Sequence, residues 1–334
     1  MASAQNLKVL SRDEIFSKEP EWRVPGGSNY FSMYSSVFGG VVTDPALMVL
    51  PVDDHMVHRG DGIFEAFKCV NGYIYNLGAH LARLQKSAEL ISLNLPFDLD
   101  TIRKIIIETV AIGGVRDCMI RLFVSRGLGG FDCAPKECPK SNLYVIAMEA
   151  WTAPDYFYAE GVSAITSKIP VKPAFFAQVK SCNYLPNVLV DMEAEQNKAE
   201  FAIMVDPEGY LAEAATENVA IVNEEKIFMY PKFDHILKGT SLLRGAQLAR
   251  DLIKAGDLKG VSQANISREK AYKSSEMLLF GTGPNVLPIV KYDGKPIGTG
   301  KPGPVFRRLR ELFQKDVKEN KKVLTPCHRY YHLL

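Results

Sequence analysis

The sequence predicts a mixed α/β fold of the α+β kind, divided into two domains. The chain has 334 residues, more than the roughly 250 residues that a single hydrophobic core usually serves. Strand-like and helical stretches follow one another without the regular βαβ rhythm of a doubly wound parallel sheet. We therefore expect a small N-terminal α/β domain over residues 1–150, a linker over residues 151–160 and a larger C-terminal domain over residues 161–334.

The N-terminal domain is expected to open with two pairs of strands. A turn at residues 25–27 precedes residues 30–52, whose apolar positions alternate as in a β-hairpin. Another strand pair is predicted at residues 62–69 and 73–75, because Asn71-Gly72 between them favours a tight turn. These segments indicate the beginning of a sheet.

Two helices and two further strands follow in the same domain. Apolar residues recur with a 3.6-residue period over residues 78–91, which predicts a helix, and residues 99–112 predict a second one. Residues 120–124 and 143–148 are strand-like runs. The long loop between these two strands contains several glycines and prolines, and a loop of that length in a compact domain usually carries function.

The segment at residues 151–158 breaks both periodicities and is the core of the predicted linker. Beyond it the sequence mixes strands and helices without an internal repeat. The predicted strands cover residues 163–166, 201–205, 219–222 and 277–280, and the predicted helices cover residues 184–198 and 242–254.

Charge and hydropathy exclude several classes of partner. The chain carries 40 basic and 38 acidic residues, so the balance gives no reason to expect a nucleic acid as partner. No apolar run approaches the roughly 20 residues that cross a bilayer, so we expect no membrane contact. Residues 1–22 contain acidic residues and no apolar core, unlike a secretory signal. The expected compartment is cytoplasmic, although a chain from which an organelle transit peptide had been removed would have the same sequence.

The cysteines predict neither disulfides nor a metal. Six cysteines are scattered along the chain without C-x-x-C spacing, so a disulfide framework and a structural zinc site are not expected. Cys327 and His328 lie near His332 at the C-terminus, where short Cys/His patterns arise freely. We therefore expect no metal in the function.

Two charged residues stand in contexts that permit catalysis. Lys180 lies between an apolar stretch and the predicted start of a helix, in AQVKSCNY. A lone lysine is usually a solvated surface charge, but desolvation lowers its pKa and makes the amine a nucleophile toward an aldehyde. Glu213, in YLAEAATENV, is either a turn carboxylate or an anion that keeps a pyridine nitrogen protonated.

Three segments could bind a phosphate group. Thr282 lies in FGTGP, where a predicted strand opens into a glycine loop. Thr240 and Ser241 precede a helical run, where they either cap the helix or, with its free N–H groups, bind an anion. His80 and Arg83 share one helix face, and Arg83 could pair with a phosphate or with a carboxylate.

Five motifs in this order resemble the signature of the fold-type IV pyridoxal-phosphate (PLP) aminotransferases. They are Arg83, Lys180 in VKSCNYLPNVL, Glu213 in EAATEN, Leu237 in ILKGTS and Thr282 in FGTGPNVLPIV. The resemblance covers about residues 30–312. It implies a two-domain fold with pyridoxal 5'-phosphate between a small N-terminal and a larger C-terminal domain, in a homodimer.

The resemblance also implies roles for individual residues. Lys180 would bind the cofactor covalently and act as the catalytic base, Glu213 would contact the pyridine nitrogen and Leu237 would pack on the ring. The phosphate group would be held by Arg83, Thr240, Ser241 and Thr282. The implied reaction moves an amino group between an amino acid and a 2-oxo acid with ping-pong kinetics.

The substrate is less clearly indicated by the resemblance. The short spacing from Lys180 to Tyr184 resembles that of D-amino-acid aminotransferases and aminodeoxychorismate lyase. Bacterial D-amino-acid enzymes bind the substrate carboxylate with a tyrosine, an arginine and a histidine, where this chain has Phe64, Phe131 and Cys133. The lyase pattern departs as well, because Ala66 replaces a threonine and Arg121 a lysine.

Phe64 and Arg121 resemble the branched-chain aminotransferases, whereas Met119 and Lys68 depart from them. The segment DDHMVHRGDGIF and the loop SRGLGGF at residues 125–131 resemble plant-type D-amino-acid aminotransferase-like proteins. We therefore expect a D-amino acid as substrate. The alternatives are a branched-chain L-amino acid aminotransferase, 4-amino-4-deoxychorismate lyase and a catalytically inactive PLP-fold binding protein. The residues expected around the substrate are Phe64, Ala66, Arg121, Phe131 and Gly283.

Overall fold

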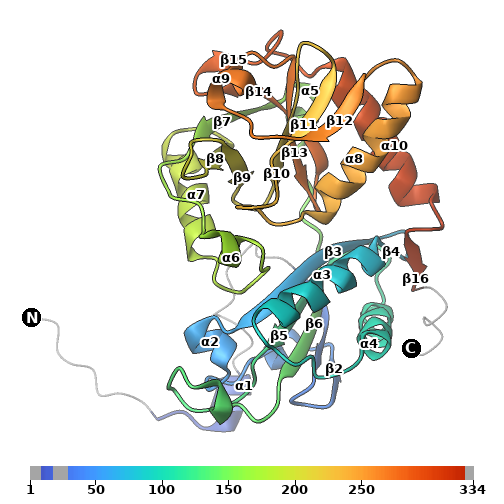
Figure 1. Cartoon of the computed structure of the whole chain (residues 1–334). Helices are drawn as coiled ribbons and strands as arrows, with labels where there is room; N and C mark the ends of the chain where they lie inside the picture. The colour runs from blue at the N-terminus through green and yellow to red at the C-terminus, as the bar shows by residue number, and fades with distance from the viewer. Residues whose placement is uncertain (1–8, 18–28, 328–334) are drawn as a thin grey trace, which may run out of the picture.

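The structure is a computed structural model that describes residues 9–17 and 29–327 and contains two β-sheets, one above the other in Figure 1. The predicted turn at residues 25–27 lies outside the described residues, as do His328 and His332 of the tail and most of residues 1–22. Residues 9–17 include one short helix, α1 (Arg12–Ser17).

The lower sheet in Figure 1 is antiparallel, and its seven strands lie in the order β16, β4, β3, β5, β6, β1, β2. Its strands are β1 (Tyr30–Ser35), β2 (Gly40–Val42), β3 (Gly62–Val70), β4 (Tyr73–Tyr75), β5 (Cys118–Ser125), β6 (Asn142–Met148) and β16 (Leu324–Pro326). Strand β16 returns from the far end of the chain to pair with β4. The sheet therefore joins the two ends of the described sequence.

Helices α3 (Leu77–Leu90) and α4 (Leu99–Ile112) pack on this sheet. Each buries apolar side chains at helical spacing, and the Asp98 carboxylate caps α4 by accepting the Thr101 N–H at 2.8 Å. The core between helices and sheet includes Ile63, Phe67, Leu81, Leu84, Ile102, Ile106 and Ile120. Short elements complete this half: η1 (Pro45–Leu47), α2 (His55–Arg59) and η2 (Pro135–Glu137).

The upper sheet is mixed and closes on itself. Its path is β12, β11, β10, β13, β14, β7, β8, β9, with β15 beside β14, and β9 also pairs with β10 through Glu213 and Asn218. Its strands are β7 (Val162–Thr166), β8 (Phe201–Val205), β9 (Leu211–Ala214), β10 (Asn218–Val222), β11 (Ile227–Tyr230), β12 (Gly260–Gln263), β13 (Glu276–Gly281), β14 (Asn285–Tyr292) and β15 (Lys295–Pro296). The closure brings Glu213 to a fixed, buried place.

Three long helices cover the upper sheet: α7 (Leu185–Gln196) on one side, and α8 (Thr240–Lys254) and α10 (Pro304–Glu319) on the other (Figure 1). The cores beneath them include Phe228, Leu242, Leu252, Phe280, Phe306 and Phe313 under α8 and α10, and Val190, Ala194, Ala202 and Met204 under α7. Three short helices complete the upper half: α5 (Asp155–Ala159), α6 (Ala174–Ala177) and α9 (Arg268–Tyr272).

The hairpin predicted over residues 30–52 is present but shorter, and it ends at Val42 because Pro45 and Pro51 have no backbone N–H to give to a sheet. The predicted linker over residues 151–160 contains helix α5. The other predicted elements are present with ends shifted by a few residues.

The prediction also missed several elements of the upper half. Strand β9 is buried on both faces, and β14 is buried over most of its length. Strands with both faces buried show no alternation of apolar and polar residues. Helix α10 was detectable, because Phe306, Leu309, Phe313 and Val317 recur at helical spacing and are buried.

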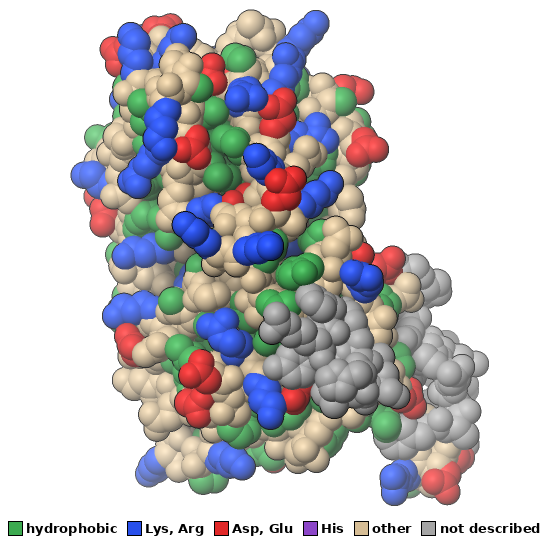
Figure 2. Space-filling view, turned by 90° about the vertical axis from the view of Figure 1, so that its right-hand side faces the viewer, with side chains coloured by type: hydrophobic (Ala, Val, Ile, Leu, Met, Phe, Trp, Pro, Cys, Tyr) green, Lys and Arg blue, Asp and Glu red, His purple; other side chains and the backbone are tan. Residues whose placement is uncertain are grey.

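The surface carries charges of both signs. On the face turned toward the viewer in Figure 2, Lys and Arg side chains alternate with Asp and Glu side chains. Within the described residues, no helix is both long and apolar enough to cross a membrane.

Candidate active site

A cavity of about 560 Å³ lies between the two sheets. Both halves of the molecule line it, and Trp151 and Phe157 of the predicted linker contribute as well. The predicted site residues that line it are Phe64, Ala66, Arg83, Arg121, Lys180, Glu213, Leu237, Thr240, Ser241, Thr282 and Gly283. The structure thus brings together residues that are as far as 219 positions apart in the sequence (64 to 283).

Lys180 lies on the segment between α6 and α7 and is tied to the lower sheet. Its carbonyl accepts the Phe64 N–H at 2.9 Å, and its own N–H donates to Ser87 Oγ at 3.2 Å. Its Nζ donates to the Tyr184 hydroxyl at 3.0 Å. Burial, reinforced by the nearby Arg83 guanidinium, lowers the pKa of Lys180 to about 7. A substantial share of the amine is then neutral and nucleophilic at pH 7.

Tyr184 is a site residue that the sequence reasoning did not single out. It lines the cavity, and its ring lies edge-on to Phe64 with the centroids 4.9 Å apart. The ring also faces Lys172, whose Nζ lies 4.5 Å from its centroid. The available signal was spacing, because Tyr184 follows Lys180 by four residues at the start of a predicted helix.

Glu213 occupies the point where β9 meets β10. One of its oxygens, Oε2, accepts the Asn218 side-chain N–H and the Leu237 backbone N–H, both at 3.1 Å. Asn218 also donates to the Leu237 carbonyl at 3.0 Å. Burial raises the pKa of Glu213 to about 7 and the Leu237 N–H opposes this. Its Oε1 makes no hydrogen bond within the described residues, so one carboxylate oxygen is available to a ligand.

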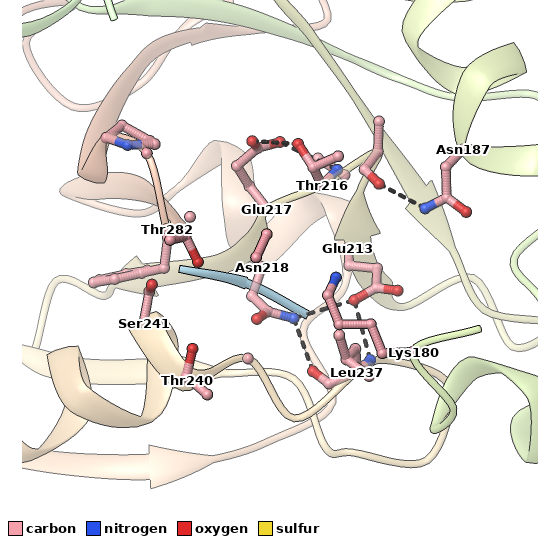
Figure 3. A pocket seen from close by; sticks show the side chains of 18 of the residues that line it. Lys180, Asn187, Glu213, Thr216, Glu217, Asn218, Leu237, Thr240, Ser241 and Thr282 are labelled. Carbon is pink, nitrogen blue, oxygen red and sulfur yellow. Dashed lines mark hydrogen bonds between the residues drawn. The ribbon is translucent and has the colours of Figure 1, made fainter. Parts of the chain in front are cut away.

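Figure 3 shows a second group of residues on the other side of the pocket, where Thr240, Ser241 and Thr282 lie together. Helix α8 begins at Thr240 after Gly239, which makes no side-chain cap. The alternative that Thr240 or Ser241 simply caps the helix is therefore wrong. The first N–H groups of a helix have no partner inside it, so this end of the pocket presents donors to an anion.

Gly239 is required for this arrangement. A Cβ atom at this position would lie 1.7 Å from Asn218 Oδ1. The side chain that holds Glu213 therefore packs directly against the residue before α8. The two ends of the site are fixed relative to each other by this contact.

The Thr282 loop is the turn of a hairpin between β13 and β14, since Gly281 pairs with Asn285. Lys68 reaches this turn from β3, donating to Asn285 Oδ1 at 2.7 Å and to the Gly283 carbonyl at 3.4 Å. Burial lowers the pKa of Lys68 to about 8. The turn is thus anchored to the lower sheet by a buried lysine.

Arg83 is held by a carboxylate at the edge of the pocket. Its Nε and Nη2 donate to Glu65 at 2.8 and 2.7 Å, and its Nη1 donates to the Lys238 carbonyl at 3.3 Å. Of the two partners that the sequence allowed, the structure shows the carboxylate. Because Arg83 also lines the cavity, this pairing does not remove it from the site.

Arg121 brings a positive charge to the wall of the pocket. It lies opposite Ala66 in the β3–β5 pair and its guanidinium makes no hydrogen bond or ion pair with any described residue. Burial lowers the pKa of Arg121, yet a guanidinium stays charged in proteins. A partly buried cation without a partner is an available site for a carboxylate. Phe64, Ala66 and Met119 make the wall around it apolar.

Phe131 is the one predicted site residue that does not line this cavity. It is 59% exposed and stacks on His58, with ring centroids 4.7 Å apart. Arg126, in the same loop, forms an ion pair with Asp61 at 3.0 Å and is likewise absent from the cavity wall. The loop that carries both residues lies against α2.

The residues present fit pyridoxal phosphate. Lys180 offers an amine for an aldehyde, and Glu213 keeps one oxygen free at the same end of the pocket. The start of α8 offers N–H groups for a phosphate at the other end (Figure 3). Among residues 9–17 and 29–327, no cluster of three or more His, Cys, Asp or Glu side chains could hold a metal ion.

Comparison with known proteins gives the family. The chain matches the family model described as amino-transferase class IV over residues 62–292. The D-amino-acid transaminase, chloroplastic, of Arabidopsis thaliana is 42% identical over 325 residues, which is 96% of this chain and 86% of that protein. A D-alanine aminotransferase of Bacillus licheniformis is 26% identical over 288 residues, with 84% and 96% of the two chains covered.

The solved structures agree with this result. A branched-chain amino acid aminotransferase from T.th., complexed with N-(5'-phosphopyridoxyl)-L-glutamate, is 27% identical and has a TM-score of 0.81, covering 90% of this chain and 99% of that one. The fold-type IV resemblance predicted from five motifs is therefore confirmed. The chain belongs to the class IV aminotransferase family.

Proposed function

We propose that the protein is a pyridoxal-phosphate-dependent aminotransferase that exchanges an amino group between a D-amino acid and a 2-oxo acid. The observation that carries this proposal is that one cavity contains a lysine with a depressed pKa, a buried carboxylate with one oxygen free of hydrogen bonds to described residues, and the open start of α8. These are the groups that must meet a reactive aldehyde, a pyridine nitrogen and a phosphate.

Each residue has a defined part in the reaction. Pyridoxal phosphate, when bound, makes the Cα proton of an attached amino acid acidic through its protonated pyridine ring. Glu213 Oε1 would accept the pyridine N–H, since Oε2 is already engaged. Lys180 Nζ would take the proton from Cα as general base and then, as general acid, deliver it to the C4′ carbon of the cofactor. Tyr184 holds this amine in place through its hydroxyl.

The phosphate would lie at the opposite end of the cavity. The backbone N–H groups of Thr240 and Ser241, the Thr282 loop and Arg83 surround this end. Leu237 lies beside Glu213, to which its N–H donates, and it lines the cavity, where it would pack on the ring.

We propose Arg121 as the binding site for the substrate carboxylate. Its guanidinium has no partner among the described residues, and Phe64, Ala66, Met119 and Gly283 line the same cavity. A bidentate pair with a carboxylate would remove the cost of an unpaired buried cation. This placement differs from the tyrosine, arginine and histidine expected in bacterial D-amino-acid enzymes.

The preference for a D-amino acid is supported by the relative from Arabidopsis thaliana, which is a D-amino-acid transaminase. A branched-chain L-amino acid is the second candidate. Its support is the apolar wall beside Arg121 and the putative branched-chain-amino-acid aminotransferase of Methanocaldococcus jannaschii, which is 29% identical over 272 residues.

The test is a steady-state assay with D-alanine as donor and 2-oxoglutarate as acceptor. Beyond the one equivalent per active site that the first half-reaction releases, pyruvate should form only when the acceptor is present, and double-reciprocal plots should be parallel, as ping-pong transfer requires. Continuous release of pyruvate from 4-amino-4-deoxychorismate without an acceptor would instead indicate lyase chemistry. Cofactor binding without any turnover of D- or L-amino acids would indicate a binding protein.

We also propose that two copies of the chain form a homodimer. Exposed apolar side chains gather on α6 and α7, an unusual number for a surface that meets only water. They include Phe175, Phe176, Leu185, Val188 and Met192. The proposed role of Phe131 at the substrate then requires a partner subunit, because this chain does not bring it to its own cavity. Light scattering should give twice the chain mass, and Leu185→Glu should reduce it.

Two further expectations remain proposals. We propose the domain boundaries 1–150 and 161–334 with one amendment, since β16 at residues 324–326 belongs to the first sheet. We propose the cytoplasm as the compartment, while the relative from Arabidopsis thaliana is described as chloroplastic. Imaging of the full-length protein fused to a fluorescent protein at its C-terminus decides between cytoplasm and plastid.

A further inference from the structure

Glu65 is a buried carboxylate that the proposed mechanism does not use. It lies on β3 with 0% of its surface exposed and does not line the cavity. Its Oε1 accepts Arg83 Nε at 2.8 Å, and its Oε2 accepts Arg83 Nη2 and His80 Nδ1, both at 2.7 Å. Burial alone would raise the pKa of Glu65, but Arg83 and His80 outweigh it and lower the pKa to about 2. The group is therefore an anion at neutral pH.

His80 carries this contact across to the other domain. Its Nε2 lies 3.3 Å from Thr240 Oγ1, at the first residue of α8. Because the ionised Glu65 can only accept, the proton of a neutral His80 belongs on Nδ1. Burial lowers the pKa of His80, which keeps the ring neutral. Its Nε2 then accepts a hydrogen bond from the Thr240 hydroxyl.

The contacts of Arg83 leave two of its N–H groups without a partner among the described residues. A guanidinium has five N–H groups, and three atoms, Nε, Nη1 and Nη2, each use one N–H on Glu65 or on the Lys238 carbonyl. Two N–H groups remain, one on Nη1 and one on Nη2. Lys238 directly precedes Gly239 and α8, so the guanidinium is held next to the open helix start.

We propose that Glu65 is a positioning residue for the cofactor phosphate: it fixes Arg83 directly and Thr240 through His80. The guanidinium and the first turn of α8 come from different halves of the molecule, and this one carboxylate sets both. Because the Thr240 hydroxyl donates its hydrogen bond to His80, Thr240 offers the phosphate its backbone N–H. The proposal rests on the proposed function, because it takes the phosphate of pyridoxal phosphate as the ligand.

The chemistry of the replacement makes the proposal testable. In Glu65→Gln, one acceptor oxygen becomes an NH2 donor and must face either Arg83 or His80, which are donors themselves. In one orientation of the amide the pair of hydrogen bonds from Arg83 is broken, and in the other the tautomer of His80 is no longer fixed. Glu65→Asp keeps the charge with a shorter side chain and should restore part of the lost affinity.

The measurement uses two ligands that differ only in the phosphate. Pyridoxine 5'-phosphate and pyridoxine both lack the aldehyde, so neither can bond to Lys180, and calorimetry on cofactor-free protein gives their affinities without any turnover. Glu65→Gln should weaken the affinity for pyridoxine 5'-phosphate by roughly 10- to 100-fold. The affinity for pyridoxine should change by less than about 2-fold. Glu89→Gln, an exposed carboxylate on α3, is the matched control and should change neither.

Each outcome decides one question. If folded Glu65→Gln loses affinity equally for both ligands, or for neither, the proposed role of Glu65 at the phosphate is overturned. If Glu65→Gln does not fold, His80→Phe keeps a ring in the same space but frees the Thr240 hydroxyl. It should weaken pyridoxine 5'-phosphate by roughly 3- to 10-fold, and unchanged affinity overturns the proposal. Wild-type protein that binds neither ligand contradicts the proposed function itself.

Discussion

The two walls of the cavity differ in how their polar groups are paired. On the wall from the upper sheet, Glu213 already holds two N–H groups with one oxygen, and Asn218 bridges it to Leu237. On the wall from the lower sheet, the Arg121 guanidinium has no partner among the described residues, and its neighbours Phe64 and Met119 are apolar.

This difference separates a permanent ligand from a transient one. A group that stays bound is best met by residues whose orientation is fixed in advance. A substrate that enters and leaves needs a charged side chain that has no permanent partner in the protein, so that the substrate can pair with it. The part of the wall around Glu213 and the start of α8 therefore has the properties of a cofactor site, and the part around Arg121 has those of a substrate site.

Removal of Lys180 should have the largest effect. Lys180→Ala removes both the attachment point and the proton carrier, so transamination should fall by roughly 10³-fold or more. The visible absorbance of lysine-bound cofactor should disappear while circular dichroism stays unchanged. Lys168→Ala, at an exposed lysine between β7 and α6, is the control, and equal activity of the two variants would contradict the role of Lys180.

Glu213→Gln tests the carboxylate that lies at the same end of the pocket as Lys180. The neutral amide cannot favour a protonated pyridine, so kcat should fall by roughly 10²-fold, while the cofactor stays attached to Lys180. Steady-state kinetics measure kcat, and the absorbance of bound cofactor measures its attachment to Lys180. Loss of cofactor together with activity would indicate a purely structural role for Glu213.

Arg121 provides the corresponding test on the substrate wall. Arg121→Met should raise KM for both the amino acid and the oxo acid and lower kcat/KM by roughly 10- to 100-fold. Affinity for the cofactor should not change, because the upper wall is intact. Arg116→Met, at an exposed arginine before β5, should leave kcat/KM as in the wild type. Weaker cofactor binding in Arg121→Met would remove the distinction between the walls.

The pH dependence of cofactor attachment sharpens the account of Lys180. Only the neutral amine attacks an aldehyde, and its pKa is lowered from 10.5 to about 7. The rate at which cofactor-free protein reacts with pyridoxal phosphate should therefore rise with pH and level off above about pH 8. A rate that keeps rising toward pH 10 would show that the pocket does not lower this pKa.

Lys68 should show the smallest effect, on stability. Its pKa in the folded protein is about 8, against 10.5 without burial, so between these values the unfolded chain binds more protons. The contribution of Lys68 to the free energy of unfolding must then increase as pH rises from 8 to 10.5. Urea titrations should show this rise in the wild type and in the Lys86→Met control, which replaces an exposed lysine, but less of it in Lys68→Met. Identical pH slopes in all three would contradict the buried position.

The sequence located the cofactor wall better than the substrate wall, and the reason is physical. Lys180, Glu213, Thr240 and Thr282 each lie where a buried element ends or begins, so short local patterns mark them. The pairing of Glu213 with Asn218 and the closure of the upper sheet depend on strands that meet only in the folded chain. Local patterns cannot show such contacts.

The same limit applies to charges. Glu65 and Arg83 are 18 residues apart and could not be recognised as a pair, so Arg83 was expected on the phosphate without its carboxylate. Phe131 was placed at the substrate from its position in a loop pattern, whereas the fold stacks it on His58. Tyr184 lies in the motif VKSCNYLPNVL, four residues after Lys180. No role in the site was predicted for it, although this spacing could have indicated one.

The central claim is amino-group transfer at Lys180 with a D-amino acid, and a single-turnover screen tests it most directly. Holoprotein is mixed with one D- or L-amino acid at a time, and the absorbance of lysine-bound cofactor is followed as it converts to that of pyridoxamine phosphate. We expect conversion with D-alanine or D-glutamate. Conversion only with L-leucine, L-isoleucine or L-valine would contradict the D-amino-acid assignment, and no conversion with any amino acid would contradict transamination itself.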